Sequence, residues 1–350
     1  FMRRPGSVAG AAAILVGSHL DSQPMAGKYD GPYGVMAGLA VLRALHAAGT
    51  PTRHPVELVV WANEEGARFA PAMMGSACYS GRLDSRQALN TADENGVTLA
   101  HALEAIGYRG SDHVEPSEHA CYLETHIEQG PLLEVGDTAV GVVTAVQGMR
   151  WTKVSLTGQA GHAGTYPMPT RRDALVAAAA VVTAVNGIGL SLPTPGRATV
   201  GRLIVEPNSP NVIPGRVELM VEFRHPDAAT LDGMCDALDR ALAEISLDTG
   251  VTVESARLLD SPTVTFAPAL VDIVRRAASA SGHSWMDMVS GAGHDACQTA
   301  PVVPTAMLFI PCVDGISHAE QERITPKWAS AGAEVLLATV LLADAELPVE

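Results

Sequence analysis

Two short motifs near the start of the chain hold side chains that bind divalent metal ions. His19 and Asp21 are two residues apart, so in an extended segment their side chains point the same way. An imidazole that binds a metal usually donates its other N–H to a carboxylate, and Asp21 is placed to accept it. Asp30 follows a loop that contains Gly27, and a carboxylate there can bridge two cations. The alternative is a solvated turn with a helix-capping Asp, and His-x-Asp alone leaves both interpretations open.

Two adjacent acids and two further histidines lie at the ends of other apolar segments. Glu64 and Glu65 alternate in direction, so one can bind a metal ion while the other acts as a general base on water. His126 and His318 lie in comparable positions. Taken singly, these features have ordinary alternatives: an exposed acidic turn for the glutamates, and a hydrogen-bonded core residue for His126.

The apolar segments themselves predict the strands of one α/β sheet. They cover residues 11–16, 55–61, 121–127 and 304–311. Helical periodicity runs from about Val35 to Ala48, and a last helix is expected over 326–345. In open α/β sheets ligands bind at the carboxyl ends of the strands, where these acids and histidines lie. We therefore expect an α/β fold whose mostly parallel central sheet is flanked by helices.

The pattern changes near Thr144 and predicts a second, smaller domain. Strands and helices are expected there in the order β-α-β-β-α-β, the split-βαβ arrangement of a small α+β sandwich. We expect this domain to occupy residues 144–260. It would be inserted into a catalytic domain made of residues 1–143 and 261–350.

Three further features of the sequence stand out. Residues 158–164 form a glycine-rich turn around His162. Residues 290–296 are glycine-rich and precede a helix, so they are expected to present backbone N–H groups to an anion. Arg224 ends a predicted strand two residues after Glu222, and an ordinary surface ion pair is the alternative to a binding role.

The composition excludes several other classes of protein. The 350 residues are 47% hydrophobic and carry a formal net charge of −15 without a basic run, which argues against nucleic acid and anionic membranes as partners. The five cysteines are widely spaced and form no CxxC pair, so we expect no disulfide framework and a reducing, cytoplasmic location. The apolar segment 174–185 is too short to span a membrane.

Eight motifs, in order along nearly the whole chain, resemble one enzyme family. They are GSHLDSQPMAGKYDGPYGV, NEEGARFAPAMMGS, ETHIEQGP, GHAGTYPM, PNSPNVIPG, FRHPD, SGAGHDA and GISHAEQE. The chain resembles the metal-dependent amidohydrolases of the M20 family, of the amidase, hydantoinase and carbamoylase type. This group includes N-carbamoyl-L-amino acid amidohydrolase, β-ureidopropionase and allantoate amidohydrolase.

The resemblance implies a centre of two divalent metal ions, with zinc expected first and manganese, cobalt or nickel as alternatives. By the resemblance, the metal ligands are His19, Asp30, Glu65, His126 and His318. Asp30 would bridge the two ions, Asp21 would orient His19, and Glu64 would be the general acid and base.

The resemblance also implies a substrate and a partner. The positions that match substrate-binding residues are Gln129, His162, Asn211 and Arg224. Arg224 would hold a carboxylate, and His162 would polarise the scissile carbonyl across a homodimer formed by the inserted domain. Tyr166 stands where the family often has a smaller residue, which we expect to narrow the pocket. The expected substrates are N-carbamoyl-L-amino acids or N-carbamoyl-β-alanine. The alternatives are an allantoate amidohydrolase, an M20 aminoacylase or peptidase, and a non-enzymatic carboxylate-binding protein.

Overall fold

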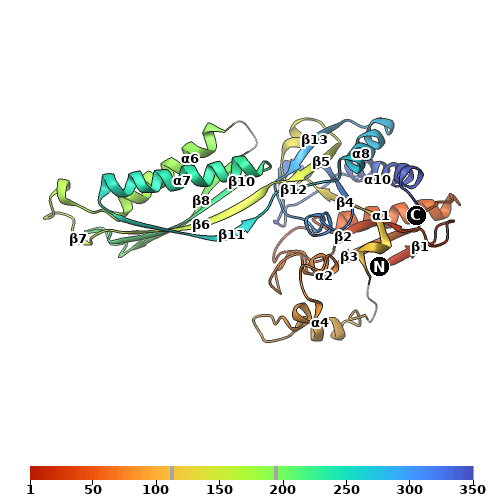
Figure 1. The fold of residues 1–350 in the computed structure, drawn as a ribbon, viewed down its shortest axis with the longest axis horizontal. Coiled ribbons are helices and arrows are strands. Elements are labelled where there is room, and N and C mark those ends of the chain that lie inside the picture. Colours follow the sequence, from red (N-terminus) through yellow and green to blue (C-terminus); the bar gives the residue numbers. More distant parts are fainter. Residues whose placement is uncertain (111–113, 193–195, 350) are drawn as a thin grey trace. The chain divides into compact units, whose positions relative to one another are not determined.

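The computed structural model describes residues 1–110, 114–192 and 196–349. The chain divides into two compact units. The first contains residues Phe1–Ala145 and Thr265–Glu350, and the second contains Val146–Val264. Each unit has its own sheet and its own helices (Figure 1).

The first unit is built on an eight-stranded, mainly parallel sheet. Along the sheet the order is β1-β3-β2-β4-β14-β5-β12, and β13 pairs with β5. The strands are β1 (Met2–Arg4), β2 (Ala13–His19), β3 (Val56–Trp61), β4 (His119–Ile127), β5 (Val140–Val146), β12 (Val264–Thr265), β13 (Trp285–Ser290) and β14 (Thr305–Ile310). The central strands β3, β2, β4 and β14 run parallel, so their carboxyl ends meet at one edge.

Close approach of two central strands depends on one glycine. Gly17 has a φ of +150°, and a Cβ added there would lie 2.0 Å from the carbonyl oxygen of Val59 on the neighbouring strand. A side chain at this position would therefore force β2 and β3 apart. The glycine keeps the ends of these two strands, and the residues that follow them, next to each other.

Helices pack against the sheet in two groups. The larger group consists of α1 (Pro32–Ala47), α8 (Pro268–Ala280) and α10 (Pro326–Glu346); α10 contacts both of the others, and all three contact the central strands. The smaller group consists of α2 (Met74–Tyr79) and α9 (Asp295–Thr299), which pack together against β3, β4 and β14. The remaining short helices of this unit are α3 (Ser85–Asn90), α4 (Leu99–Ala105), α5 (Leu132–Val135), η1 (Pro116–Glu118) and η3 (Val313–Gly315).

The second unit is a four-stranded antiparallel sheet covered on one face by two helices (Figure 1). The order is β11-β6-β10-β8, with β6 (Gly148–Thr157), β8 (Arg197–Glu206), β10 (Arg216–His225) and β11 (Thr252–Ser261). Helices α6 (Ala174–Ser191) and α7 (Ala228–Thr249) pack on alternate, buried residues of β10 such as Leu219 and Phe223. A two-residue ladder joins β7 (Gly161–His162) to β9 (Val212–Ile213), and η2 (Met168–Thr170) follows β7.

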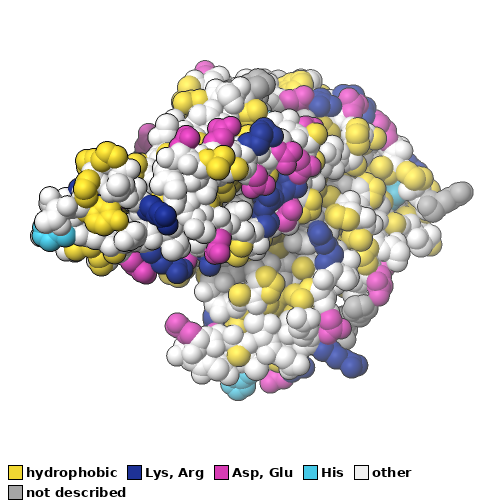
Figure 2. Space-filling model, turned by 60° about the vertical axis from the view of Figure 1, so that its left-hand side comes forward, with side chains coloured by type: hydrophobic (Ala, Val, Ile, Leu, Met, Phe, Trp, Pro, Cys, Tyr) yellow, Lys and Arg dark blue, Asp and Glu magenta, His cyan; other side chains and the backbone are white. Residues whose placement is uncertain are grey.

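The predicted fold class is confirmed, whereas one expectation about α6 is wrong. The apolar segment continues to Ser191, and α6 and α10 are both long and apolar enough to cross a membrane by length and composition. Core helices of globular proteins also meet that criterion. Here α10 packs with α1 and α8, and one side of α6 packs on β8 and β10. On the face seen in Figure 2, basic and acidic side chains are intermixed.

Candidate functional site

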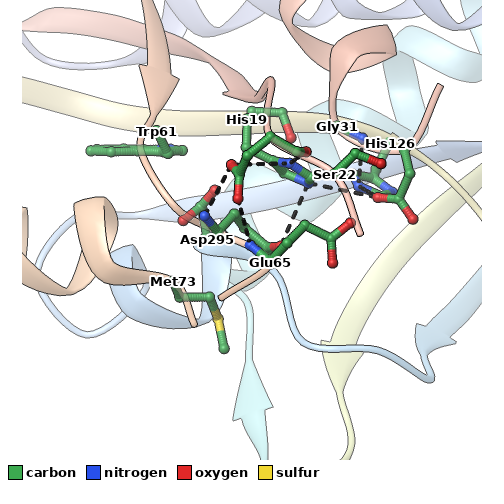
Figure 3. Close-up of polar contacts among 12 residues, drawn as sticks. His19, Ser22, Gly31, Trp61, Glu65, Met73, His126 and Asp295 are labelled. Atoms are coloured by element: carbon green, nitrogen blue, oxygen red, sulfur yellow. Dashed lines mark hydrogen bonds and ion pairs between the residues drawn. The ribbon is translucent and has the colours of Figure 1, made fainter. Parts of the chain in front are cut away.

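The predicted site residues of the first unit lie at the carboxyl edge of its sheet. His19 is the last residue of β2, and His126 is the last but one of β4. Glu64 and Glu65 lie in the turn after β3, and His318 follows β14. The side chains of His19, Glu65 and His126 lie together in the close-up (Figure 3). Parallel strands thus gather residues that are far apart in the sequence.

Asp30 is the centre of this cluster. Its Oδ1 lies 3.0 Å from His126 Nε2 and 3.6 Å from His19 Nε2. Its Oδ2 lies 3.3 Å from His318 Nε2, which is itself 3.5 Å from Glu65 Oε2. Two groups of three possible metal ligands result, namely His19, Asp30 and His126, and Asp30, Glu65 and His318. Within each group the ligand atoms lie within 4.8 Å of one another.

Both buried histidines turn the same ring nitrogen toward Asp30. His19 Nδ1 lies 3.0 Å from the backbone oxygen of Asp21, and His126 Nδ1 lies 2.9 Å from that of Ile127. A carbonyl oxygen only accepts, so Nδ1 carries the proton in each neutral ring. Each Nε2 then lies on the side of Asp30, and in the neutral ring its lone pair is the one that a metal ion would use.

The charges in the cluster are strongly coupled. Burial and the nearby His126 lower the pKa of His19 to about 4, so this ring is neutral at pH 7. Burial also opposes the charge on His126, but Asp30 raises the pKa of His126 to about 9. In return, despite its burial, the pKa of Asp30 is held well below its usual value by His126. A cation at this position would compete with the proton of His126.

One carboxylate oxygen of Glu65 accepts a hydrogen bond, and the other does not. Gln23 Nε2 donates to Glu65 Oε2 at 3.0 Å and to the Glu65 backbone oxygen at 2.9 Å. Glu65 Oε1 is buried and has no hydrogen-bond partner among the described residues. Burial raises the pKa of this carboxyl. An unpartnered buried oxygen within a cluster of possible ligands suits a cation.

Glu64 is buried beside other acids. Its Oε2 lies 3.6 Å from His19 Nε2. Burial, and then the negative charges of Asp295 and Glu124, raise the pKa of Glu64 well above its usual value. Glu124 itself accepts from Ser18 Oγ and from the N–H of Ala296, each at 2.8 Å. A carboxyl in these surroundings takes up a proton readily.

The glycine-rich segment 290–296 does present a backbone N–H to an anion, but the anion belongs to the protein. The donor is Ala296 at the start of α9, and the acceptor is the Glu124 carboxylate. His294 in the same segment packs its ring against His126, with ring centroids 4.5 Å apart. The segment therefore supports the back of the cluster.

Asp21 makes a different contact from the one expected. Its carboxylate accepts the N–H groups of Glu64 at 3.1 Å and Glu65 at 3.0 Å. The carboxylate oxygen nearest to His19 Nδ1 is 3.7 Å away, whereas the backbone oxygen of Asp21 is 3.0 Å away. Asp21 thus holds the glutamate turn with its side chain and the His19 ring with its main chain.

Gln129 joins the cluster through Asp30. Its Nε2 donates to Asp30 Oδ2 at 2.6 Å, and its buried Oε1 has no partner among the described residues. Gln129 and His318 have φ values of 58° and 55°, in the left-handed region that side chains other than glycine seldom adopt. Such backbone strain often marks functional positions.

Three predicted substrate-binding residues lie in the second unit. The N–H of Gly164 donates to His162 Nδ1 at 3.0 Å, and the N–H of Ala163 donates to the Asn211 backbone oxygen at 3.1 Å, so His162 and Asn211 are neighbours. Arg224 lies near the opposite end of β10, where its Nε donates to Glu222 Oε1 at 2.7 Å. The ion pair suggested by the sequence spacing is therefore present.

Several supporting residues were not singled out from the sequence. They are Gln23, Ser317, Glu322, Glu124 and Asp295. All lie within the eight motifs, but polar residues within a motif have no sequence feature that separates a supporting role from solvent exposure. Three of them, Glu124, Asp295 and Glu322, are distinguished by their burial, because burying an unpaired carboxylate is costly.

Fold and site together define a class, the hydrolases with a possible metal-binding site at the edge of an α/β sheet. Residues 15–342 match the model of peptidase family M20/M25/M40, and the chain belongs to this family. The family is generally metal-dependent, and the cluster of His19, Asp30 and His126 is a possible metal-binding site. The chain is accordingly a hydrolase that acts on amide or ureido C–N bonds.

Named relatives and solved structures place the chain within one branch of the family. The N-carbamoyl-L-amino-acid amidohydrolase of Rhizobium meliloti is 42% identical over 97% of this chain and 82% of its own length. The allantoate amidohydrolase of Bacillus subtilis is 32% identical over 96% of this chain and 82% of its own length. A solved amidase of the hydantoinase/carbamoylase family from Burkholderia multivorans is 49% identical, with a TM-score of 0.96 over 99% of this chain and 84% of that chain.

Proposed function

We propose that the protein hydrolyses the ureido C–N bond of N-carbamoyl-L-amino acids or N-carbamoyl-β-alanine. One water molecule is consumed, and the free amino acid and carbamic acid are formed. Carbamic acid then breaks down to CO2 and ammonia. Three relatives that are 36%, 37% and 42% identical, among them those from Rhizobium meliloti and Paenarthrobacter aurescens, are named N-carbamoyl-L-amino acid amidohydrolases, which supports this substrate class.

The observation that carries the proposal is the position of Asp30 in both groups of possible ligands. Neutral imidazole nitrogens and carboxylate oxygens suit zinc and other borderline divalent ions. His19 and His126 present nitrogens on one side of Asp30, and Glu65 and His318 present donors on the other. These five residues would hold two divalent ions, with Asp30 shared between them. Ions bound there would polarise the scissile carbonyl and lower the pKa of a water molecule.

Glu64 is the proposed proton carrier. Its raised pKa, its burial and its position 3.6 Å from His19 Nε2 support this role. We propose that Glu64 takes the proton from the attacking water and delivers it to the leaving nitrogen. General acid–base catalysis of this kind accelerates reactions by roughly 10²- to 10⁴-fold.

His162 is the proposed donor to the carbonyl oxygen of the substrate. Its Nδ1 accepts from Gly164, so in the neutral ring the proton lies on Nε2. A fixed N–H donor can stabilise the negative charge that develops on this oxygen during attack. The backbone oxygen of Asn211 accepts a hydrogen bond from the residue after His162, and Asn211 is proposed to assist His162 in this role.

Arg224 is proposed to bind the substrate carboxylate, because its planar guanidinium matches a carboxylate with two parallel hydrogen bonds. Arg216 is at the end of β10 that is nearer to β9, and Arg224 lies eight residues further along the strand. At about 3.3 Å per residue, the two positions are roughly 26 Å apart. His162 and Arg224 of one chain are therefore too far apart to hold one small substrate. We infer that each site combines groups from two chains.

A homodimer formed through the second unit would supply this second set of groups. Helix α6 exposes apolar side chains such as Val176, which is 59% exposed, and Leu190, which is 78% exposed. The adjacent strand β8 is an edge of the sheet and exposes Leu203. An apolar helix face beside an open strand edge suits pairing with a second copy.

The five free thiols support the proposed cytoplasmic location.

Allantoate is the second candidate substrate, since the relative from Bacillus subtilis is an allantoate amidohydrolase. The decisive experiment is an activity panel on the protein loaded with Zn²⁺, Mn²⁺ or Co²⁺. The panel contains N-carbamoyl, N-acetyl and N-formyl amino acids, N-carbamoyl-β-alanine, dipeptides and allantoate. We expect the highest kcat/KM on an N-carbamoyl amino acid. Faster hydrolysis of allantoate or of N-acyl substrates would replace this proposal with the corresponding alternative.

A further inference from the structure

We propose that Glu322 is a positioning residue that holds Asp30 and His318 in place for cation binding; this inference rests on the two-ion site proposed above. Glu322 lies between His318 and helix α10, and it is only 2% exposed. A buried carboxylate needs hydrogen-bond donors, because burying its charge without them is costly. The donors found for Glu322 come from the two segments that carry Asp30 and His318.

One oxygen of Glu322 holds the loop that carries Asp30. Its Oε1 accepts the backbone N–H of Tyr29 at 2.8 Å and that of Asp30 at 3.1 Å. These two amides precede helix α1 and come from a segment almost 300 residues away in the sequence. The contact fixes the main chain of Asp30 rather than its side chain, so the carboxylate of Asp30 remains available to a cation.

The other oxygen of Glu322 shares a serine with Asp30. Ser317 Oγ lies 3.1 Å from Glu322 Oε2 and 2.8 Å from Asp30 Oδ2. A hydroxyl has a single hydrogen, so Ser317 donates to one of the two carboxylates at a time. When Asp30 Oδ2 faces a cation it has less need of this hydrogen, and Glu322 can accept it. With Glu322 as the alternative acceptor, the Ser317 hydroxyl can give up its hydrogen bond to Asp30 and still donate its hydrogen.

The loop before Asp30 packs directly against Glu322. A Cβ added at Gly27 would lie 2.2 Å from Glu322 Oε1, so the loop before Asp30 closes directly over this side chain. On the other side, His318 follows Ser317 and has a φ of 55°. A histidine in the left-handed region needs neighbouring contacts to keep it there. The hydrogen bond from Ser317 to Glu322 is such a contact.

Asp344 provides a matched control for a purely structural role. It is also a buried carboxylate, 8% exposed, and it accepts two consecutive backbone amides, those of Arg53 at 3.0 Å and His54 at 2.7 Å. These contacts tie α10 to the segment before β3 and involve none of the proposed ligands. Removing Glu322 or Asp344 should therefore cost similar stability, but only Glu322 should affect cation binding.

The test compares Glu322→Ala with Asp344→Ala in the full chain after metal removal. Each protein is titrated with Co²⁺ and followed by visible absorption, and urea unfolding of the metal-free proteins is measured in parallel. We expect wild type to bind two equivalents of Co²⁺. We expect Glu322→Ala to bind at least one of them about 10- to 100-fold more weakly, the range usual for residues that support metal ligands. Asp344→Ala should lose stability and keep wild-type Co²⁺ affinity.

Glu322→Gln keeps the inference testable if the alanine variant does not fold. The Gln oxygen can still accept from Tyr29 and Asp30, but its NH2 group donates to Ser317, whose hydrogen must then stay on Asp30. We expect this variant to unfold at the same urea concentration as wild type and to bind Co²⁺ about tenfold more weakly. Wild-type affinity in both Glu322 variants, or an equal loss in Asp344→Ala, would overturn the role of Glu322 alone. Fewer than two Co²⁺ bound by wild type would instead overturn the two-ion site.

Discussion

At the scale of single residues, Glu64 offers the most direct test of the chemistry. Glu64→Gln keeps the size of the side chain but cannot take up a proton at neutral pH. We expect kcat to fall by roughly 10²- to 10⁴-fold with unchanged metal content, because only proton transfer is removed. Steady-state kinetics and metal analysis measure the two quantities. Glu57→Gln, a buried glutamate on β3, is the control and should keep kcat. Turnover of Glu64→Gln within tenfold of wild type would rule out the role.

His162 should matter for the rate and not for the metal ions. Removing a donor to a developing oxyanion costs on the order of 10²- to 10³-fold in rate. We therefore expect His162→Ala to lose kcat to this extent while its metal content stays at the wild-type level. His101→Ala, at an exposed position of α4, is the control. Equal activity of the two variants would show that His162 has no part in the reaction.

Arg224 should matter for binding. Lys keeps the positive charge but lacks the planar fork that matches a carboxylate, so Arg224→Lys should raise KM at least tenfold and change kcat less. Arg216→Lys, an exposed position on the same strand, should behave as wild type. The assignment predicts that the defect disappears with substrates that lack the carboxylate. A defect of the same size on those substrates would refute it.

The sequence predicted the residues that bear side-chain chemistry more readily than those that support them. His19, Asp30, Glu65, His126 and His318 could be named because histidines and acids at strand ends form a pattern of their own. The structure brings all five to one cluster. The cluster is supported by the buried carboxyl groups of Glu124, Asp295 and Glu322. Nothing in the sequence spacing of these residues shows that they are buried. The contact of the Asp21 carboxylate with two backbone amides was equally hidden, since sequence spacing does not report main-chain geometry.

At the scale of elements, one buried network joins three strands and a helix of the first unit. Glu57 on β3 accepts from Arg3 on β1 at 2.9 Å and contacts His119 Nε2 on β4 at 2.8 Å. The Nδ1 of His119 lies 2.8 Å from the hydroxyl of Tyr79 on α2. Above all the hydrogen bond to His119 lowers the pKa of Glu57 below its ordinary 4.5, although burial opposes it. The ionised form of Glu57 is therefore the one that the fold stabilises.

This pKa shift predicts a pH dependence of stability. A carboxyl whose pKa is lower in the folded protein contributes its full stabilisation above the unfolded pKa, and the contribution is lost as the pH falls through the folded value. At pH 7 the free energy of unfolding of the metal-free wild type should exceed that of Glu57→Gln by roughly 1.5–3 kcal/mol, the range for hydrogen bonds to charged groups. The difference should shrink below pH 4.5. Urea unfolding at pH 7, 5 and 4 measures it, and a constant difference would contradict the prediction.

The elements themselves were predictable where their periodicity was strong. The strands β2, β3, β4 and β14 and the helices α1 and α10 lie within a few residues of their expected positions. The strands β1, β5, β12 and β13 and the helix α2 were not anticipated. They are short or lie at the margins of the sheet, where pairing with a neighbour decides the structure more than the local sequence does.

At the scale of the whole molecule, the exposed face of α6 should decide the oligomeric state. Val176→Glu places a charge on this face, and we expect it to convert the proposed dimer into a monomer, because a charge cannot be buried there without a partner. Leu247→Glu on α7 is the control, since that residue is 84% exposed but lies outside the face. Light scattering coupled to gel filtration measures the mass. A Val176→Glu protein that stays dimeric would place the interface elsewhere.

The order of strands in the first sheet bears on how the protein is made. Strand β14, near the end of the chain, lies between β4 and β5, which are synthesised far earlier. While the chain is being synthesised, that sheet has a gap in its middle until β14 is made. Residues 146–264 are contiguous and can become compact during this interval. A nascent chain can thus have a folded second unit well before it has the His318 that a cation would need.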